Sequence, residues 1–363
     1  MTVIARIPGA QRSLRARATR LVRMATTPLL PADYLDIINP LREGADLRGR
    51  IEAIHPETRD SVTLVVRPGR DWRSHTPGQY VRIGVDVDGV RQWRAYSLTS
   101  PTDRTDGRIT ITVKAIPDGA VSNHLVRHAR VGTLIRLDQA QGDFVLPDAR
   151  PGKVLFVTAG SGITPVMGML RNAIDDLNDV VLMHSAPSPD DVIFAGELRM
   201  LAGQRRIRLI ERHTDADGML DVGDIGGIVP DWAERETWAC GPTGLLDAIE
   251  EHWAAAGIAN RLHTERFRPT VLVTGEGGAV TFSRTELTVE ADGSTPLLDA
   301  GERAGVLMPS GCRMGICFGC VSPLREGAVR DLRTGEITTA APGDGVLIQT
   351  CVSAAAGACD IEL

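Results

Sequence analysis

Hydrophobic residues between residue 46 and residue 149 fall in short runs, and Pro-Gly and Asp-Gly pairs separate several of these runs. Short runs that alternate with turn signals are typical of antiparallel β-structure. We expect strands over Ser61–Arg67, Tyr80–Val87, Arg108–Ala115 and Thr133–Leu137. The pattern therefore predicts a small antiparallel β-barrel over residues 46–149.

The pattern changes near residue 150, where continuous apolar strands begin to alternate with helical stretches. Lys153–Ala159 reads KVLFVTA, the kind of run that a parallel sheet buries on both faces. A helix is predicted over Val166–Asn172. Further strands and helices are predicted over Val180–His184, Ile193–Leu201, Ile207–Arg212, Thr237–Cys240 and 243–256. Residues 150–268 therefore predict an α/β domain.

A third pattern follows the segment 269–279, PTVLVTGEGGA, which predicts a linker. Strands are expected over Val280–Ser283 and Glu286–Glu290, and a helix is expected over Pro296–Ala304. Residues 280–363 form the third predicted domain, and residues 1–45 precede the barrel as a basic helical leader. The 363-residue chain is thus predicted to be a multidomain β and α/β protein. No stretch approaches the ~20 apolar residues of a membrane span.

Four cysteines near the end of the chain carry the strongest chemical signal. Cys312, Cys317 and Cys320 lie in the run GCRMGICFGC, and Cys351 follows 31 positions later. This C-x4-C-x2-C spacing with a distant fourth cysteine is typical of the ligands of a plant-type [2Fe–2S] cluster. Glycines between the cysteines let the backbone approach a cluster closely. We therefore predict that the four thiolates bind one [2Fe–2S] cluster.

Zinc and disulfides are the alternatives for these cysteines. Zinc sites usually use paired C-x2-C knuckles, and the chain has only one such pair. No secretory signal is visible, and the remaining Cys240 and Cys359 leave no obvious disulfide framework. The cysteines instead suit a reducing cytoplasm.

Two short motifs in the barrel region are candidates for binding a flavin. The first is Arg94-Ala95-Tyr96-Ser97. An arginine can neutralise a phosphate, a tyrosine ring can lie along a flat heterocycle, and a serine hydroxyl can bond a ring nitrogen. The second, Gly119-Ala120-Val121-Ser122, follows Val113-Lys114 and opens a predicted helix, whose N–H groups suit a pyrophosphate.

The α/β region carries a nucleotide motif between its first strand and helix. Gly160-Ser161-Gly162-Ile163-Thr164-Pro165 lets a pyrophosphate approach the helix N-terminus. Its proline replaces the third glycine of the usual dinucleotide fingerprint, which argues against a classical dehydrogenase. A later strand ends at Cys240-Gly241-Pro242. Ser185 lies at the end of the second strand, where the 2′-phosphate of NADPH would bind. Arg205, Arg206 and Arg212 follow it in the sequence. NADPH or NADH is therefore the expected donor, with the arginines favouring NADPH.

Together these motifs resemble those of the ferredoxin–NAD(P) reductase superfamily, over about residues 46–363. The resemblance implies that R-x-Y-S binds FAD rather than FMN, that Ser97 lies near flavin N5, and that the G-x-V-S turn holds the diphosphate. It also implies that Cys240 lies near the hydride path and that Phe267 approaches the flavin ring, with Glu265 a weaker candidate. The last domain resembles the β-grasp ferredoxin fold.

The candidate site residues fall into three groups. The catalytic candidates are Ser97, Cys240 and Phe267. The cofactor-binding candidates are Arg94, Ala95, Tyr96, Ser97, Val113, Lys114, Gly119, Val121, Ser122, Gly160, Gly162, Ile163, Thr164, Pro165, Ser185, Cys240, Gly241, Pro242 and Phe267. The metal ligands are Cys312, Cys317, Cys320 and Cys351.

Charge is spread unevenly along the chain. The first 30 residues hold six arginines and no acid, whereas residues 279–363 hold 6 Arg and 11 Asp or Glu, a net charge of −5. Residues 12–25 place apolar residues on one helical face and arginines on the other. This segment is interpreted as a helix with a solvated basic face, as an interfacial helix on anionic lipid, or, least favoured, as a presequence. We expect a cytoplasmic protein, with peripheral contact at the inner membrane face through residues 12–25 as the second interpretation, and no nucleic-acid partner.

The order of the motifs predicts an electron-transfer enzyme. Reduced nicotinamide supplies a hydride to FAD, and the cluster passes electrons singly to an outside protein. The leader, including Pro31–Leu35 and Ile38–Leu41, resembles actinobacterial reductases that serve membrane acyl-CoA desaturases. Reductases for a cytochrome P450, an alkane hydroxylase or a ring-hydroxylating oxygenase are the alternatives. A redox-sensing binding protein is the second function class, and turnover with cytochrome c would separate it from the enzyme.

Overall fold

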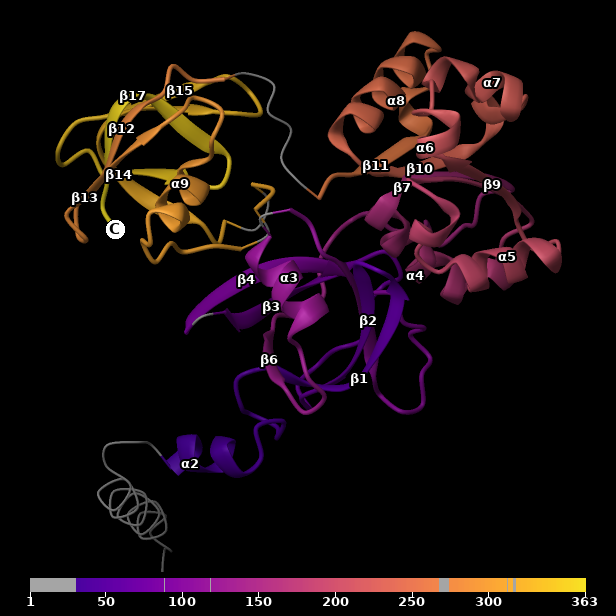
Figure 1. Ribbon diagram of the computed structural model, residues 1–363, viewed down its shortest axis with the longest axis horizontal. Coiled ribbons are helices and arrows are strands. Elements are labelled where there is room, and N and C mark those ends of the chain that lie inside the picture. The colour runs from indigo at the N-terminus through magenta and orange to yellow at the C-terminus, as the bar shows by residue number, and fades with distance from the viewer. Residues whose placement is uncertain (1–30, 88, 118, 268–273, 312, 316–317) are drawn as a thin grey trace, which may run out of the picture.

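The computed structural model describes residues 31–87, 89–117, 119–267, 274–311, 313–315 and 318–363. Within these residues the chain forms a barrel, an α/β domain and a third, β-rich domain, coloured in that order from indigo to yellow in Figure 1. The short helix α2, Pro31–Ile38, precedes the barrel. No helix in the described part of the chain is long and apolar enough to cross a membrane. The predicted basic helix over residues 12–25 lies outside the described residues.

The barrel is a six-stranded antiparallel sheet in the order β4-β3-β6-β1-β2-β5. Its elements are β1 Arg48–Thr58, β2 Ser61–Pro68, β3 Tyr80–Val87, β4 Val90–Ser97, β5 Ile109–Lys114, α3 Ala120–Arg127 and β6 Leu134–Leu137. The four predicted strands are present within a few residues of their expected ends. The sequence pattern missed β1 because two register shifts break its alternation of apolar and polar side chains.

The α/β domain has a parallel sheet in the order β11-β10-β7-β8-β9. Its strands are β7 Lys153–Ala159, β8 Asp179–Ala186, β9 Arg208–His213, β10 Glu236–Cys240 and β11 Leu262–Glu265. Its helices are η1 Gly160–Gly162, α4 Ile163–Ala173, η2 Ile174–Asp176, η3 Pro189–Asp191, α5 Ala195–Gly203, α6 Thr214–Asp217, η4 Val222–Asp224, α7 Ile225–Ile228, η5 Trp232–Glu234, α8 Thr243–Ala255 and η6 Ala259–Arg261. Alternate residues of β7 enter two cores on opposite faces of the sheet, which explains its continuous apolar run.

The third domain packs α9, Leu297–Arg303, on a mixed sheet in the order β13-β12-β17-β14-β15, with β16 paired to β14. The strands are β12 Gly278–Phe282, β13 Leu287–Ala291, β14 Val321–Asp331, β15 Ile337–Ala340, β16 Val346–Gln349 and β17 Ser353–Ile361. Since β12 begins at Gly278, the last two residues of the expected linker belong to the sheet. The sequence pattern missed β14 because bulges and a left-handed Gly327 interrupt it.

The barrel and the α/β domain are packed tightly together. Gly168 of α4 lies against the carbonyl of Leu98, and an added Cβ at this position would collide with that oxygen. Arg171 of α4 donates to the Thr99 carbonyl at 2.7 Å. Phe144 and Leu146, which follow the last barrel strand, belong to the same hydrophobic core as α4. The core of the third domain contains only its own residues.

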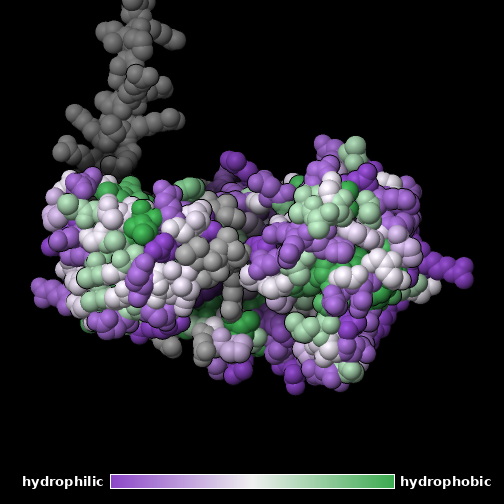
Figure 2. Space-filling view, turned by 90° about the horizontal axis from the view of Figure 1, so that it is seen from above, coloured by the Kyte–Doolittle hydropathy of each residue, from purple (hydrophilic) through white to green (hydrophobic). Residues whose placement is uncertain are grey.

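The third domain and the α/β domain form two lobes of the molecule, above the barrel in Figure 1. Seen from above, these lobes carry mostly hydrophilic residues, with hydrophobic residues in small groups (Figure 2). Scattered apolar residues are normal on a protein surface.

Candidate cofactor sites

Arg94 lies within β4 and is half-buried. Its guanidinium donates to the Trp93 carbonyl at 2.8 Å and to Gln92 Oε1 at 3.1 Å, and it stands 4.0 Å from a carboxylate oxygen of Glu302. Burial, and next the charge of Arg313, lower the pKa of Arg94 to about 10. A desolvated cation that lies close to a second cation is suited to an anionic diphosphate.

The rest of the R-A-Y-S motif offers a neutral and largely buried surface. Burial raises the pKa of the Tyr96 phenol, so the ring stays uncharged. Ser97 is buried, and its Oγ has no hydrogen-bond partner among the described residues. An unsatisfied buried hydroxyl is costly unless a ligand engages it. These residues and Arg94 therefore fit a flavin, and which part of the flavin each of them meets stays a prediction.

The G-A-V-S motif forms the start of α3, as predicted, with Gly119 as the N-cap. Ser122 Oγ donates to the Gly119 carbonyl at 3.1 Å and accepts from the Ile116 N–H at 3.3 Å. A Cβ on Gly119 would collide with Ser122 Oγ, so the turn requires glycine. Because the hydroxyl is used within the turn, the backbone N–H groups of the first helical turn remain as donors for a diphosphate.

Three other predicted flavin contacts have their side chains engaged in the barrel. Val113 and Val121 are fully buried in its hydrophobic core. The Lys114 ammonium donates to both carboxylate oxygens of Asp60, at 2.6 and 2.7 Å. Only the backbone of these residues is left to meet a ligand, and their role in binding stays a prediction.

The nucleotide motif forms a compact turn at the carboxyl end of β7. Gly160 has a left-handed φ of 53°, and Thr164 Oγ1 donates to the Ser161 carbonyl at 2.9 Å. Gly162 lies against the carbonyl of Cys240, where an added Cβ would collide. The turn therefore brings the glycine motif and the C-G-P turn, Cys240-Gly241-Pro242, together, while Ile163 and Pro165 are buried.

Cys240 and Glu265 lie side by side as register partners on β10 and β11. Burial, and next the charge of Glu265, raise the pKa of the thiol. Burial raises the pKa of Glu265 to about 8, and its Oε2 has no partner among the described residues. Glu265 is thus an uncharged acid at the strand ends near neutral pH. Phe267 follows it with 38% of its surface exposed.

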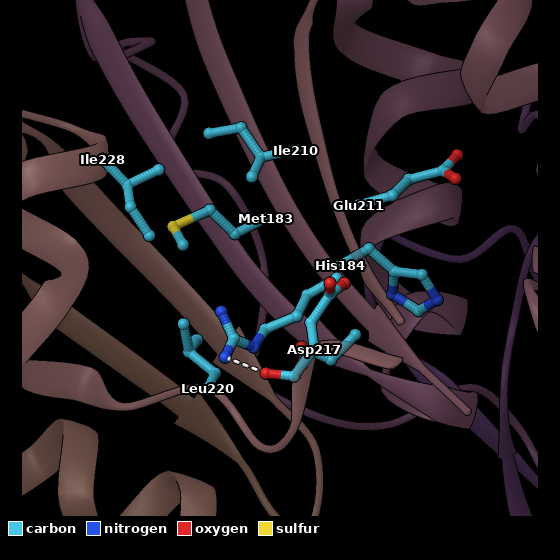
Figure 3. Close-up of a pocket in the computed structure, with 9 residues that line it drawn as sticks. Met183, His184, Ile210, Glu211, Asp217, Leu220 and Ile228 are labelled. Carbon is cyan, nitrogen blue, oxygen red and sulfur yellow. Dashed lines mark hydrogen bonds between the residues drawn. The ribbon is translucent and has the colours of Figure 1, made fainter. Parts of the chain in front are cut away.

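A pocket opens at the carboxyl ends of β8 and β9 (Figure 3). Met183, Ile210 and Ile228 lie on one side of it, while the side chains of His184 and Glu211 point away from them. Ser185 and Arg212 also line the pocket and are register partners. Arg212 donates to the carbonyls of residues 217 and 218, at 2.6 and 2.8 Å.

The other two arginines expected to reach a 2′-phosphate are placed differently. Arg205 and Arg206 precede β9, so they lie at the amino end of a strand whose carboxyl end forms the pocket. Arg206 is bonded to the Ile174 carbonyl and to Asp175. The expectation that all three arginines are within reach is therefore corrected, and Arg212 alone of the three lines the pocket.

The described part of the cluster site brings Cys320 and Cys351 together. Both are buried, and the Thr350 hydroxyl donates to the Cys320 carbonyl at 3.0 Å. Gln349 Nε2 and Arg333 Nη1 donate to the Gly315 carbonyl at 3.0 and 3.2 Å. Cys312 and Cys317 lie outside the described residues. Cys351 lies two residues before β17, and the two described thiols fit ligands of one cluster.

The folds and sites define a flavin- and iron–sulfur-containing NAD(P)H oxidoreductase. Three family models match, in chain order: an oxidoreductase FAD-binding domain over residues 62–146, an oxidoreductase NAD-binding domain over 156–251, and a 2Fe-2S iron-sulfur cluster binding domain over 280–356. The chain belongs to the ferredoxin–NAD(P) reductase superfamily, in the group with a C-terminal [2Fe–2S] ferredoxin domain. Its cofactors are FAD, NAD(P)H and one [2Fe–2S] cluster.

Known proteins resemble the chain over most of its length. It is 51% identical over 358 residues to an NADPH oxidoreductase of Mycobacterium tuberculosis, covering 97% of this chain and 92% of the relative. It is 30% identical over 307 residues to a glycine betaine monooxygenase reductase subunit of Pseudomonas aeruginosa, covering 76% and 84%. The solved structure of phthalate dioxygenase reductase matches its fold with a TM-score of 0.62 and 22% identity, covering 87% and 97%.

The bound cofactors supply the chemistry, in which a hydride enters and single electrons leave. The chain's own residues bind, orient and exclude water around them. Arg94 and the start of α3 offer charge and donors to a diphosphate. Gly162 permits the close turn, and the raised pKa of Glu265 keeps its proton in place near neutral pH.

Glu265 should make the stability of the fold depend on pH. Its folded pKa of about 8 lies above the ordinary value of 4.5, so the folded chain keeps a proton that the unfolded chain releases. The free energy of unfolding should then fall by up to about 1.4 kcal/mol per pH unit between these two values because of this group. Glu265→Gln should abolish the fall, as measured by denaturant unfolding at several pH values.

The comparison of Glu265→Gln with the unchanged protein isolates this group. The lowered pKa of His184, about 4, gives the opposite slope at acid pH, but it contributes equally to both proteins. Glu251→Gln, an exposed residue of α8, is the control for loss of a carboxylate. Parallel stability curves for Glu265→Gln and the unchanged protein would contradict the prediction.

Proposed function

We propose that the chain oxidises NADPH and delivers the electrons to a separate membrane-bound acyl-CoA desaturase. The observation that carries this proposal is the extent of the resemblance. The match to the mycobacterial NADPH oxidoreductase covers 97% of the chain, so it includes most of the leader over residues 1–45, whereas the match to the glycine betaine monooxygenase reductase subunit covers 76%. The leader is the segment that resembles the reductases of desaturases.

The pocket at β8 and β9 supports NADPH as the donor. Ser185 offers a hydroxyl and Arg212 a guanidinium that is bonded to backbone carbonyls rather than to a carboxylate. A guanidinium can bind a 2′-phosphate through two parallel hydrogen bonds. The name of the mycobacterial relative also specifies NADPH.

The helix α2 supports contact with a membrane surface. Leu35, Ile37 and Ile38 are exposed by 53, 70 and 80%, directly after a segment with six arginines. Apolar side chains beside a basic segment are typical of helices that bind anionic lipid, and each basic residue near such a surface adds ~1 kcal/mol. In this proposal the acidic ferredoxin domain, with its net charge of −5, meets a basic face of the acceptor.

Removal of residues 1–25 tests the membrane part of the proposal. The truncated chain should reduce cytochrome c at an unchanged rate but deliver electrons more slowly to a desaturase in anionic vesicles at low salt, because it loses the arginines. Vesicles of neutral lipid are the control, in which both forms should perform alike. Equal support of the desaturase in anionic vesicles at low salt would show that the segment is a solvated surface element.

A separate oxygenase is the second candidate acceptor. The 30% identity to a reductase subunit of a glycine betaine monooxygenase supports it. Reconstitution of the full chain with a desaturase and with an oxygenase, in separate assays, distinguishes the two candidates by the rate of product formation. Failure to reduce cytochrome c at all would favour a redox sensor over either enzyme.

A further inference from the structure

Two arginines of the barrel contact the ferredoxin domain, one at Ser310 and one at Glu302 of α9. Arg82 of β3 donates to the Ser310 carbonyl at 3.3 Å, two residues before the predicted ligand Cys312. Arg94 of β4 stands 4.0 Å from Glu302 of α9, which in turn bonds Arg313, the residue directly after Cys312. The barrel therefore contacts the ferredoxin domain at Ser310 directly and at Arg313 through Glu302.

Glu302 is the central residue of the second contact. One of its oxygens accepts from Arg313, while the other faces Arg94 of the barrel. Arg313 also donates to Asp299 at 2.8 Å and has a left-handed φ of 60°, so α9 holds it in an uncommon conformation. Glu302 thus lies between two cations from different domains, and with Asp299 it offsets their repulsion.

Two neighbouring side chains of the barrel orient Arg82, which makes the contact with Ser310. Arg82 forms an ion pair with Asp138 at 3.2 Å, and its guanidinium lies 5.4 Å from the centre of the Trp93 ring. Ion pairing and stacking together orient an arginine fork. The donor that meets the Ser310 carbonyl is therefore pre-oriented.

We propose that Glu302 is a positioning residue that links the flavin-binding Arg94 to the cluster loop and thereby holds the ferredoxin domain where flavin and cluster exchange electrons. Each such transfer moves one electron from the reduced flavin to a ferric ion of the cluster. The flavin is oxidised by one electron, the cluster is reduced by one, and no covalent bond forms between them. Glu302 acts on the orientation of the two domains.

Glu302→Gln tests the proposal in the full-length protein loaded with FAD and cluster. After mixing with NADPH, the loss of flavin absorbance by hydride transfer should keep its rate, while reduction of the cluster should slow by about fivefold, as expected when one ion pair of a network is lost. Glu290→Gln is the matched control, because Glu290 is an exposed residue of β13 in the same domain. It should leave both rates unchanged.

Hydrogen–deuterium exchange gives a readout independent of turnover. In Glu302→Gln, the amides of β4 and of residues 306–311 should exchange faster if the contact between the domains is weakened. An altered cluster spectrum with unchanged exchange in β4 would mean that Glu302 only supports its own loop, and would overturn the proposal. Unchanged exchange with an unchanged rate of cluster reduction would overturn it as well.

Arg82→Gln provides a second variant if Glu302→Gln fails to retain its cluster. It removes the other contact from the barrel side and leaves the bonds within the cluster loop intact. Slower cluster reduction with unchanged hydride transfer would again support docking on the barrel. Equal rates in this variant and the unchanged protein would count against it.

Discussion

Replacement of Cys351 by serine is expected to abolish or distort the visible absorption of the iron–sulfur cluster and to leave the flavin bound. Cys351 is buried two residues before the last strand, its neighbour Thr350 bonds the Cys320 carbonyl, and Cys320 and Cys351 are half of the only C-x4-C-x2-C…C set in the chain. Without the cluster, reduction of cytochrome c should fall to the low rate supported by flavin alone. Absorption spectra with iron, sulfide and flavin analysis measure the result.

Cys359→Ser is the matched control for this substitution. Cys359 is also buried in the ferredoxin domain, on β17, but it lies outside the ligand spacing. This variant should keep its iron, its sulfide and its spectrum. Zinc in place of iron and sulfide in the unchanged protein would refute the assignment of the site.

The second large effect is expected at Arg94. Arg94→Ala removes a charge-assisted contact to the flavin diphosphate, worth ~1.5–3 kcal/mol, so flavin affinity should fall about tenfold to a hundredfold. Titration of the flavin-free protein with FAD, followed by fluorescence, measures the change.

Two controls separate this contact from general effects on the barrel. Arg91→Ala removes another arginine of β4 that is paired with Asp86 at the surface, and it should bind flavin normally. Glu302→Gln removes the carboxylate that faces Arg94 and should also retain flavin affinity. Unchanged affinity in a folded Arg94→Ala protein would contradict the assignment of Arg94 to the diphosphate.

Much of this fold was predicted from local sequence patterns, because the burial of a strand determines the order of its apolar and polar residues. The strand β7 has the predicted ends because both of its faces are covered, and β3 is bounded by turns on each side. The strands β1 and β14 were missed because bulges shift their register, and such shifts depend on the partner strand rather than on the strand's own sequence.

In the site, too, short motifs predicted some residues, whereas the positions of others depend on tertiary packing. Arg94, Ser97 and Gly162 were found from short motifs, since each motif needs its residues at fixed spacing. Glu265 was ranked low because its raised pKa arises from the packing of β11 beside β10, which the local sequence does not encode. Arg206 was expected to favour NADPH because distance along the chain does not show which end of a strand a residue occupies.

The barrel shares a hydrophobic core with the α/β domain, whereas the ferredoxin domain has a core of its own. This difference decides where recombination between related genes would split a core. Phe144 and Leu146 of the barrel belong to the core of the α/β domain, whereas the ferredoxin domain buries only its own residues and meets the barrel through the arginines 82 and 94. A recombination event near residue 150 would split a core. One between residues 267 and 274 would leave intact the cores that the described residues form and would exchange one electron carrier for another, which would then have to match the contacts of Arg82 and Arg94.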